Sequence, residues 1–279
     1  MSELKPVLDH VVINVLANLD NAFARYRQLG FQLTERGHHT LGSSNHLAIF
    51  GQNYLELLGY EPERASQRAE LWTYPEGLTG LVFKPPADAN FANLLKARNV
   101  PASEPREFSR PVELPSGSQD AKFRVVHLDE VIPDARVFFC HHFTPELVWR
   151  DEWRHHPNGV TDITGFAISS HEPRRSAEVF GRVYGSENLL PTDGGLRLPS
   201  GNADVLFLMP EEIARRFGST APVASASGGA RMAALTFRTA SLPTLRRLLS
   251  SAGVQFTDED GRILVPADEA CGVVLVFSA

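Results

Sequence analysis

Residues 8–15, with the sequence LDHVVINV, open a pattern that returns three times along the chain. This stretch is rich in β-branched residues and predicts a strand. Asn18 is a candidate helix N-cap, apolar residues recur at helical spacing over 19–29, and Gly30 is placed to end that helix. Three more strands are predicted over 31–34, 45–50 and 54–58, the last two joined by a tight turn at 51–53. The region therefore predicts one βαβββ module.

The same order of elements is predicted three more times. The second round has strands at 79–83, 123–127 and 136–140 with a helix from Phe91, and the third runs from a strand at 163–168 to a strand at 204–208. The fourth begins at 234–237, has its helix near 242–249, and ends with strands at 262–265 and 272–277. Repetition of one supersecondary unit is the strongest signal in the sequence. We expect an α+β protein of four βαβββ modules, paired into two domains.

The boundary between the two domains is predicted in the long connection 144–162. This connection contains Pro145, Pro157 and Gly159, which favour turns over regular elements. We expect domains at 1–150 and 151–279. Trp149 and Trp153 also lie here, so the connection is expected to pack against the domains or to form an apolar wall for a ligand.

Composition excludes several classes of protein. Of the 279 residues, 43% are apolar and 22% charged, which is typical of a globular protein. A net charge of −6 argues against nucleic acid as the main partner, and no apolar stretch approaches the roughly 20 residues that a membrane helix needs. The first residues have no apolar signal region, and two cysteines provide no disulfide framework. We expect a cytoplasmic protein without a membrane or nucleic-acid partner.

Several stretches resemble the vicinal-oxygen-chelate superfamily, which includes glyoxalase I and the extradiol dioxygenases, and in particular its glyoxalase-like branch. The resemblance covers essentially the whole chain, and its informative motifs lie before about residue 160. They are 8–12 (LDHVV), 29–31 (LGF), 45–50 (NHLAIF), 54–57 (YLEL), 142–149 (HFTPELVW) and 156–159 (HPNG). The resemblance implies that two modules pair and that their curved sheets close around a cavity. It also implies a divalent metal held by His and Glu side chains from the first and last strands of each module.

When the superfamily's ligand positions are matched one by one to this sequence, the resemblance implies three candidate metal ligands. His10 stands on the first strand of module one and Glu56 on its last strand. In module two the first strand offers Thr79 or Gly80, which cannot replace an imidazole or carboxylate. Its last strand offers His141 and His142, of which only one can face the cavity because side chains alternate along a strand. Matching the last strands favours His142.

The resulting set of His10, Glu56 and His142 leaves coordination positions open, as is typical of a catalytic metal. Two imidazoles and a carboxylate suit Fe, Mn or Zn without choosing among them. The alternatives are that His10 is a hydrogen-bonded core histidine and that Glu56 faces water on an edge strand. His46 is a candidate catalytic base beside Glu56, or else a structural histidine. His156 lies in a predicted turn, from which it could also reach the cavity rim.

The second domain offers no such ligands. All ten histidines occur by residue 171, and Ala234 and Val276 stand at the positions expected to bind metal in module four. We interpret this half as a degenerate copy that serves support, dimerisation or lid duties. A homodimer is compatible with the sequence but not required by it.

The leading functional hypothesis is a metal-dependent enzyme acting on a small oxygenated organic substrate, as a lyase, isomerase or dioxygenase. Glyoxalase I activity itself is not expected, because its four-ligand pattern fails at Thr79 and Gly80. The alternative is a metal-free protein that binds an aromatic or hydrophobic small molecule. A ligand-free structural dimer is a third class, and no sequence feature argues for it.

Overall fold

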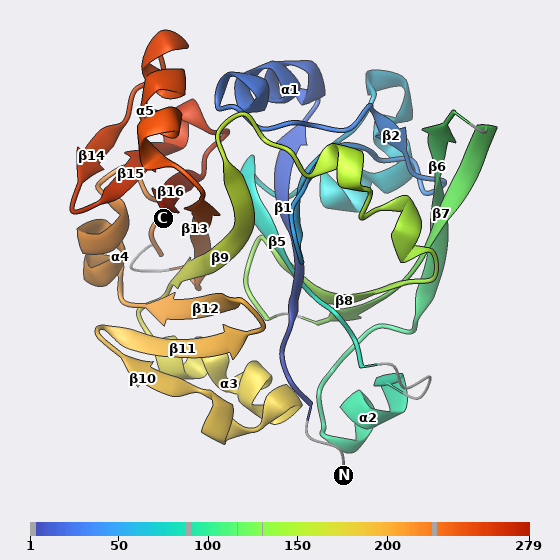
Figure 1. The fold of residues 1–279 in the computed structure, drawn as a ribbon. Coiled ribbons are helices and arrows are strands. Elements are labelled where there is room, and N and C mark those ends of the chain that lie inside the picture. The colour runs from blue at the N-terminus through green and yellow to red at the C-terminus, as the bar shows by residue number, and fades with distance from the viewer. Residues whose placement is uncertain (1–3, 87–90, 116, 130, 225–227) are drawn as a thin grey trace.

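The computed structural model describes residues 4–86, 91–115, 117–129, 131–224 and 228–279. Its strands form two eight-stranded sheets (Figure 1). We call them sheet A, with the order β2-β3-β4-β1-β5-β8-β7-β6, and sheet B, with the order β10-β11-β12-β9-β13-β16-β15-β14. The second order repeats the first, position by position. The predicted architecture of four βαβββ modules in two paired sets is therefore confirmed.

Sheet A and its helices occupy the first half of the chain. Its elements are β1 (Leu8–Leu16), α1 (Leu19–Gln28), β2 (Gly37–His38), β3 (Ser44–Ile49), β4 (Tyr54–Gly59), β5 (Gly77–Phe83), α2 (Phe91–Ala97), β6 (Arg106–Leu114), β7 (Gly117–Leu128) and β8 (Arg136–His142). A 3₁₀ segment, η1 (Pro62–Leu71), lies between β4 and β5. The predicted strand at 31–34 does not form: the second strand of module one is the short β2, which starts three residues later.

Sheet B follows after two 3₁₀ turns, η2 (Pro145–Leu147) and η3 (Asp151–Trp153). Its elements are β9 (Val160–Ser169), α3 (Pro173–Tyr184), η4 (Ser186–Asn188), β10 (Leu190–Thr192), β11 (Gly195–Ser200), β12 (Ala203–Leu208), α4 (Pro210–Phe217), β13 (Arg231–Thr239), α5 (Leu242–Ser251), β14 (Thr257–Glu259), β15 (Arg262–Val265), η5 (Ala267–Glu269) and β16 (Val274–Ser278). No helix in the described ranges combines the length and the apolar character that crossing a bilayer requires.

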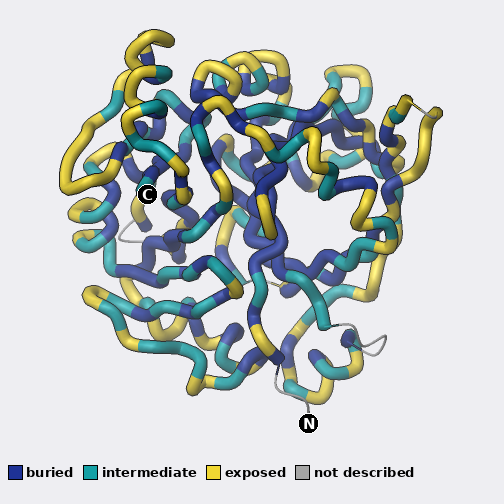
Figure 2. The backbone as a smooth tube through the Cα atoms, viewed as in Figure 1, coloured by how far each residue is buried: buried dark blue, intermediate teal, exposed yellow. Residues whose placement is uncertain are grey.

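Strand β1 lies at the centre of sheet A, parallel to β4 and antiparallel to β5. It is buried along almost its whole length, whereas the tip of the β6–β7 hairpin is exposed (Figure 2). A strand covered on both faces needs apolar residues throughout, which explains the near-continuous apolar run at 11–15. Asp9, His10 and Asn14 are buried on this strand. Burying a polar side chain without a partner is costly, so each of these residues is expected to have a polar partner.

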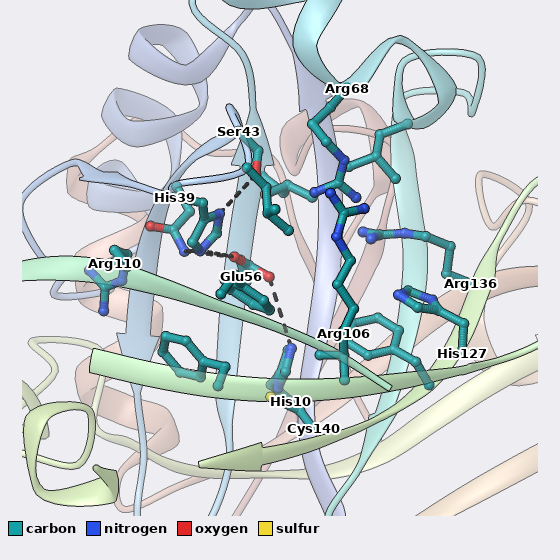
Figure 3. Close-up of a pocket in the computed structure, with 18 of the residues that line it drawn as sticks. His10, His39, Ser43, Glu56, Arg68, Arg106, Arg110, His127, Arg136 and Cys140 are labelled. Atoms are coloured by element: carbon teal, nitrogen blue, oxygen red, sulfur yellow. Dashed lines mark hydrogen bonds and ion pairs between the residues drawn. The ribbon is translucent and has the colours of Figure 1, made fainter. Parts of the chain in front are cut away.

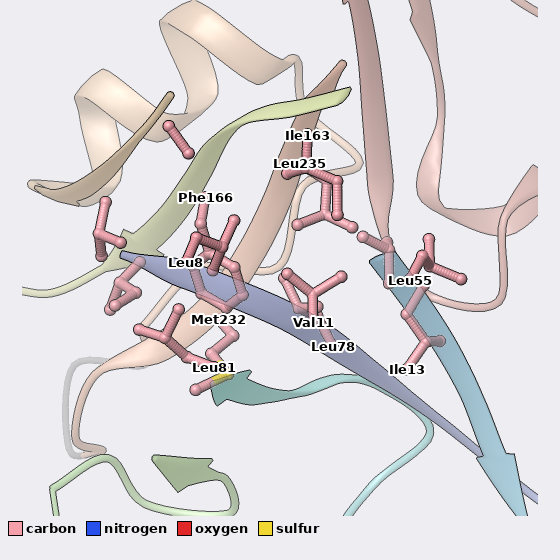
Figure 4. Packing of buried hydrophobic residues seen from close by; sticks show 14 of the residues in the cluster. Leu8, Val11, Ile13, Leu55, Leu78, Leu81, Ile163, Phe166, Met232 and Leu235 are labelled. Atoms are coloured by element: carbon pink, nitrogen blue, oxygen red, sulfur yellow. The ribbon is translucent and has the colours of Figure 1, made fainter. Parts of the chain in front are cut away.

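The two sheets share one hydrophobic core. Val11 and Ile13 of β1 face Ile163 and Phe166 of β9 and Leu235 of β13 (Figure 4). Because side chains alternate along a strand, Val12, which lies between Val11 and Ile13, points to the other face of sheet A. His10, which precedes Val11, points to that face as well. One face of sheet A therefore packs against sheet B. The opposite face of sheet A, which we call its inner face, is the one that can hold a site. The domain boundary near residue 150 stays a prediction.

Candidate functional site

The inner face of sheet A encloses a cavity of about 230 Å³. Its lining comes from β1, β3, β4, β6, β7 and β8 together with residues of η1 and of the loops beside β3 (Figure 3). Leucines and aromatic rings form much of the wall, and the remainder is polar and includes four arginines. The polar lining residues are His10, His39, Ser43, Asn45, Tyr54, Glu56, Arg68, Ser103, Glu104, Arg106, Arg110, His127, Arg136 and Cys140.

A bulge in β1 places two neighbouring polar residues near this face. Leu8 pairs with Phe83 and His10 pairs with the next residue, Val82, so Asp9 has no partner in the ladder. Such a bulge reorients side chains that would otherwise alternate strictly. Asp9 can therefore bond to His10 and also reach across to β8.

The carboxylate of Asp9 connects two of the predicted ligands. Its Oδ2 lies 2.6 Å from Nδ1 of His10 and 2.9 Å from Nε2 of His142. Burial alone would raise the pKa of Asp9, but the two imidazoles more than offset that effect and hold the pKa well below its usual range. Asp9 is therefore ionised and can only accept, so both imidazoles donate to it.

His10 is oriented toward the cavity by this bond. With Nδ1 donating to Asp9, Nε2 is the ring nitrogen that faces the cavity, and it lies 3.9 Å from Oε2 of Glu56. The ring stacks on Tyr54 at 4.3 Å between centroids, which restricts its rotation. A carboxylate that fixes the far nitrogen of a histidine is the usual second shell of a metal-binding imidazole.

Glu56 is buried on β4, which lies between β3 and β1 inside the sheet. The alternative of a water-facing Glu56 on an edge strand is therefore excluded. Its Oε1 accepts from Asn45 Nδ2 at 2.6 Å and lies 3.9 Å from Nε2 of His39. Burial would raise the pKa of Glu56, but His39 and His10 lower it below the ordinary value, so the carboxylate is ionised.

Strand β8 presents Arg136, Phe138 and Cys140 to the cavity. His142 lies on the same face of β8 but beyond the lining residues, among the rings of Tyr54, Phe123 and Trp149. His141 points to the opposite face, where it contacts Phe143. Of the two histidines, His142 is thus the one that reaches the Asp9–His10 pair.

Asp9, Cys140 and His142 form a compact candidate metal site, because their ligand atoms lie within 4.8 Å of one another. Two buried atoms of this group, Asp9 Oδ1 and His142 Nδ1, have no hydrogen-bond partner. Burial, followed by the charges of Asp9 and Glu56, raises the pKa of Cys140, so its thiol is protonated here. A carboxylate, imidazoles and a thiol that a cation would deprotonate fit a divalent transition metal. His10 and Glu56 supply a second ligand pair beside this group.

Two histidines singled out in the sequence lie away from the cavity. Asn45 and Leu47 of β3 line it, whereas His46 between them faces the other side, where Nδ1 lies 2.9 Å from the carbonyl of Thr34. The ring of His46 packs on Phe23. His156 donates through Nε2 to the carbonyl of Ile49 and accepts through Nδ1 from the amide of Gln32. Neither His46 nor His156 lines the cavity.

Several polar residues of the site were missed by sequence reasoning. His39 lies outside the predicted strands, and Asp9 and Asn45 lie within predicted strands, but none of the three is among the candidate site residues. The arginines Arg68, Arg106, Arg110 and Arg136 come from η1, β6 and β8, far apart in the sequence and without a shared motif. The one local signal was Asp9 itself, an acidic residue next to a histidine inside a buried apolar strand.

The corresponding face of sheet B differs. Ala234 and Val276, at the positions where module four was expected to place ligands, belong to an apolar cluster with Ile213 and Phe217 of α4. Helix α4, which follows β12 as η1 follows β4, covers this face.

Comparison with known proteins agrees with the geometry. Residues 8–184 match the family model described as a glyoxalase-like domain. A search of curated protein sequences finds no match. Among solved structures, a hypothetical protein from Staphylococcus aureus aligns with a TM-score of 0.65 at 12% identity, over 97% of this chain and 98% of that chain.

Two other similar structures are named for enzymes. A mutant of 4-hydroxymandelate synthase from Streptomyces coelicolor aligns with a TM-score of 0.56 at 11% identity, over 98% of this chain and 92% of that chain. A xylose isomerase-like TIM barrel/4-hydroxyphenylpyruvate dioxygenase fusion protein aligns with a TM-score of 0.58 at 11% identity, over the whole of this chain and 50% of that chain. At such low identity these likenesses establish the fold alone.

Proposed function

Because this chain belongs to the glyoxalase-like domain family of the vicinal-oxygen-chelate superfamily, we propose that it is a metal-dependent enzyme acting on a small oxygenated organic molecule in the cavity of sheet A. The observation that carries the proposal is the line Asp9–His10–Glu56. Asp9 fixes Nδ1 of His10, and Nε2 faces an ionised carboxylate inside an enclosed space. The two atoms are 3.9 Å apart, within ion-pair distance but too far for a hydrogen bond, so neither uses that atom in a hydrogen bond to the other.

We propose His10, Glu56 and His142 as the ligands, with Asp9 as the carboxylate shared by the two histidines. Cys140, whose sulfur lies beside Asp9 and His142, is the competing third donor. A bound divalent ion would act as a Lewis acid on substrate oxygens.

The surrounding residues would bind the substrate and move its proton. Once released from the metal, Glu56 would serve as the base through Oε2, because Oε1 accepts from Asn45 and Oε2 is the oxygen nearest to His10. The apolar wall formed by Leu47, Leu58, Phe123 and Phe138 would exclude water from the reacting atoms. Proton abstraction next to a carbonyl, as in a lyase or isomerase, and dioxygenase chemistry are both compatible with this arrangement.

Metal content tests the proposal. Purified protein, reconstituted with Fe(II), Mn(II) and Zn(II) in turn, is expected to bind one of them near stoichiometrically, as measured by elemental analysis and calorimetry. His10→Ala and Glu56→Gln should abolish this binding, and Asp9→Asn should weaken it by about 10- to 100-fold through the second shell. The exposed His155→Ala is the matched control and should bind as the native protein does.

Parallel variants of His142 and Cys140 decide the third ligand. Loss of metal in His142→Ala with retention in Cys140→Ser supports the proposed set, and the reverse pattern replaces His142 with Cys140. Absence of metal from the native protein under every condition would overturn the enzyme proposal. It would favour the second candidate, a metal-free protein that binds a small molecule between the aromatic residues of the same cavity.

A further inference from the structure

One end of the cavity carries a concentration of positive charge for which the metal proposal has no use. Arg68, Arg106 and Arg136, which we call the arginine cluster, converge beside His127 (Figure 3). The three guanidinium groups are close enough to lower the pKa of His127, after burial, to about 3. They come from η1, β6 and β8, so the fold brings them together although the sequence separates them.

Two members of the arginine cluster form no ion pair among the described residues, although the carboxylates of Glu56 and Glu104 also line the cavity. In the described part of the chain, no carboxylate lies within ion-pair distance of Arg106 or Arg136, whereas Arg68 pairs with Glu70 at 2.6 Å. Nε of Arg136 is buried without a hydrogen-bond partner, and burial lowers the pKa of this guanidinium to about 10. Arg136 as a whole is partly buried and Arg106 is exposed, so the cost lies in this one N–H group. A buried donor without a partner is unfavourable for folding, and it is expected where an anion binds.

The shape of the cavity and the chemistry of its wall favour a carboxylate as the bound anion. Guanidinium groups match the planar fork of a carboxylate, and the wall next to the cluster is apolar and aromatic, with Phe138 beneath the guanidinium of Arg136. A space of about 230 Å³ admits one small ring or a short chain. Glu56 faces the same cavity and would repel a highly charged ligand.

We propose that the arginine cluster is a carboxylate-binding subsite, and that the protein acts on a small organic acid with an apolar body. The carboxylate binds at Arg136 and Arg106, and the rest of the molecule extends along Phe138 toward His10 and Glu56. The proposal rests on the proposed function in one respect: the acid held by the arginines is the molecule that reacts at His10 and Glu56.

Binding of benzoate and of its neutral analogue benzamide tests the subsite without requiring activity. Calorimetry in the presence of EDTA should give benzoate a dissociation constant at least tenfold lower than that of benzamide. Arg136→Gln and Arg106→Gln should each weaken benzoate binding about tenfold and leave benzamide binding unchanged. Arg124→Gln is the matched control, because Arg124 lies on neighbouring β7 but pairs with Glu107 outside the cavity, and it should bind benzoate as the native protein does.

Thermal denaturation separates a binding role from a structural one. Removal of an unpaired buried charge should leave the melting temperature of Arg136→Gln equal to or above that of the native protein, while benzoate binding is lost. A lower melting temperature with an unchanged preference for benzoate would overturn the proposal. Equal binding of benzoate and benzamide, or displacement of benzoate by inorganic phosphate at lower concentration, would overturn it as well.

The test also distinguishes the two proposals. If the native protein binds no divalent metal on reconstitution and yet prefers benzoate in EDTA, the carboxylate subsite stands and the metal-dependent enzyme is rejected. Metal binding without any benzoate preference does the opposite.

Discussion

His156 shows how a single buried residue connects distant parts of the chain. Its ring donates to the carbonyl of Ile49 and accepts from the amide of Gln32, so it holds the linker against module one. Burial lowers its pKa from 6.5 to about 4, and the folded protein therefore keeps it neutral. His39 and His127 are buried with pKa values lowered in the same direction.

This depressed pKa predicts a loss of stability in acid. Between pH 6.5 and 4 the unfolded chain binds the proton that folded His156 refuses, so the free energy of unfolding falls as the pH falls through this window. From pH 7 to pH 5 the contribution of His156 should decrease by about 2 kcal/mol. His156→Gln retains one donor and one acceptor but does not titrate, so urea denaturation at both pH values should show a correspondingly smaller loss in the variant. An equal loss in both proteins would contradict the assignment.

At the scale of an element, β5 explains why module two supplies no ligand from its first strand. Gly80 pairs with Val12 of β1, and a methyl group on Gly80 would lie 2.5 Å from Cβ of Val12. A histidine at Gly80 would therefore collide with β1. The same crowding recurs in sheet B, where a methyl group on Gly165 of β9 would lie 2.9 Å from Cβ of Thr236 of β13.

The two distances predict that alanine substitution lowers the free energy of unfolding more at Gly80 than at Gly165. Gly80→Ala should destabilise the protein by about 1–3 kcal/mol through overpacking, and Gly165→Ala should cost less because its contact is longer. Chemical denaturation of both variants measures the order. A neutral Gly80→Ala would show that β1 and β5 can separate, and the position could then accept a ligand side chain.

For the molecule as a whole, the two sheets behave as one unit because their cores are continuous. Phe31 and Phe50 of the first half pack with Phe237 of β13, and Phe31 also packs with Phe277 of β16. Asn53, fully buried in the turn before β4, donates to the carbonyl of Ile163 and accepts from its amide, both at 2.9 Å. It thereby satisfies two backbone groups of β9 that water cannot reach.

Asn53→Ala should lower the free energy of unfolding by about 2–4 kcal/mol, since two buried backbone groups lose their partner. The exposed neighbour Gln52→Ala is the control and should have little effect. The three tryptophans all lie in the first 153 residues, so fluorescence reports on that half while circular dichroism reports on both sheets. Coincident urea transitions are expected for the native protein, and separate transitions would refute a shared core.

The sequence by itself determined the modular fold, because local periodicity and turn residues specify each βαβββ unit and the unit repeats. It also indicated His10 and Glu56 as candidate site residues through the resemblance to a known superfamily. Only the tertiary structure decided which residues meet them. Three features depend on strand pairing between segments far apart in the chain. They are the bulge that brings Asp9 to His10 and His142, the face on which His46 lies, and the convergence of three arginines. No local pattern encodes that pairing, since a shift of one residue in register exchanges the two faces of a strand.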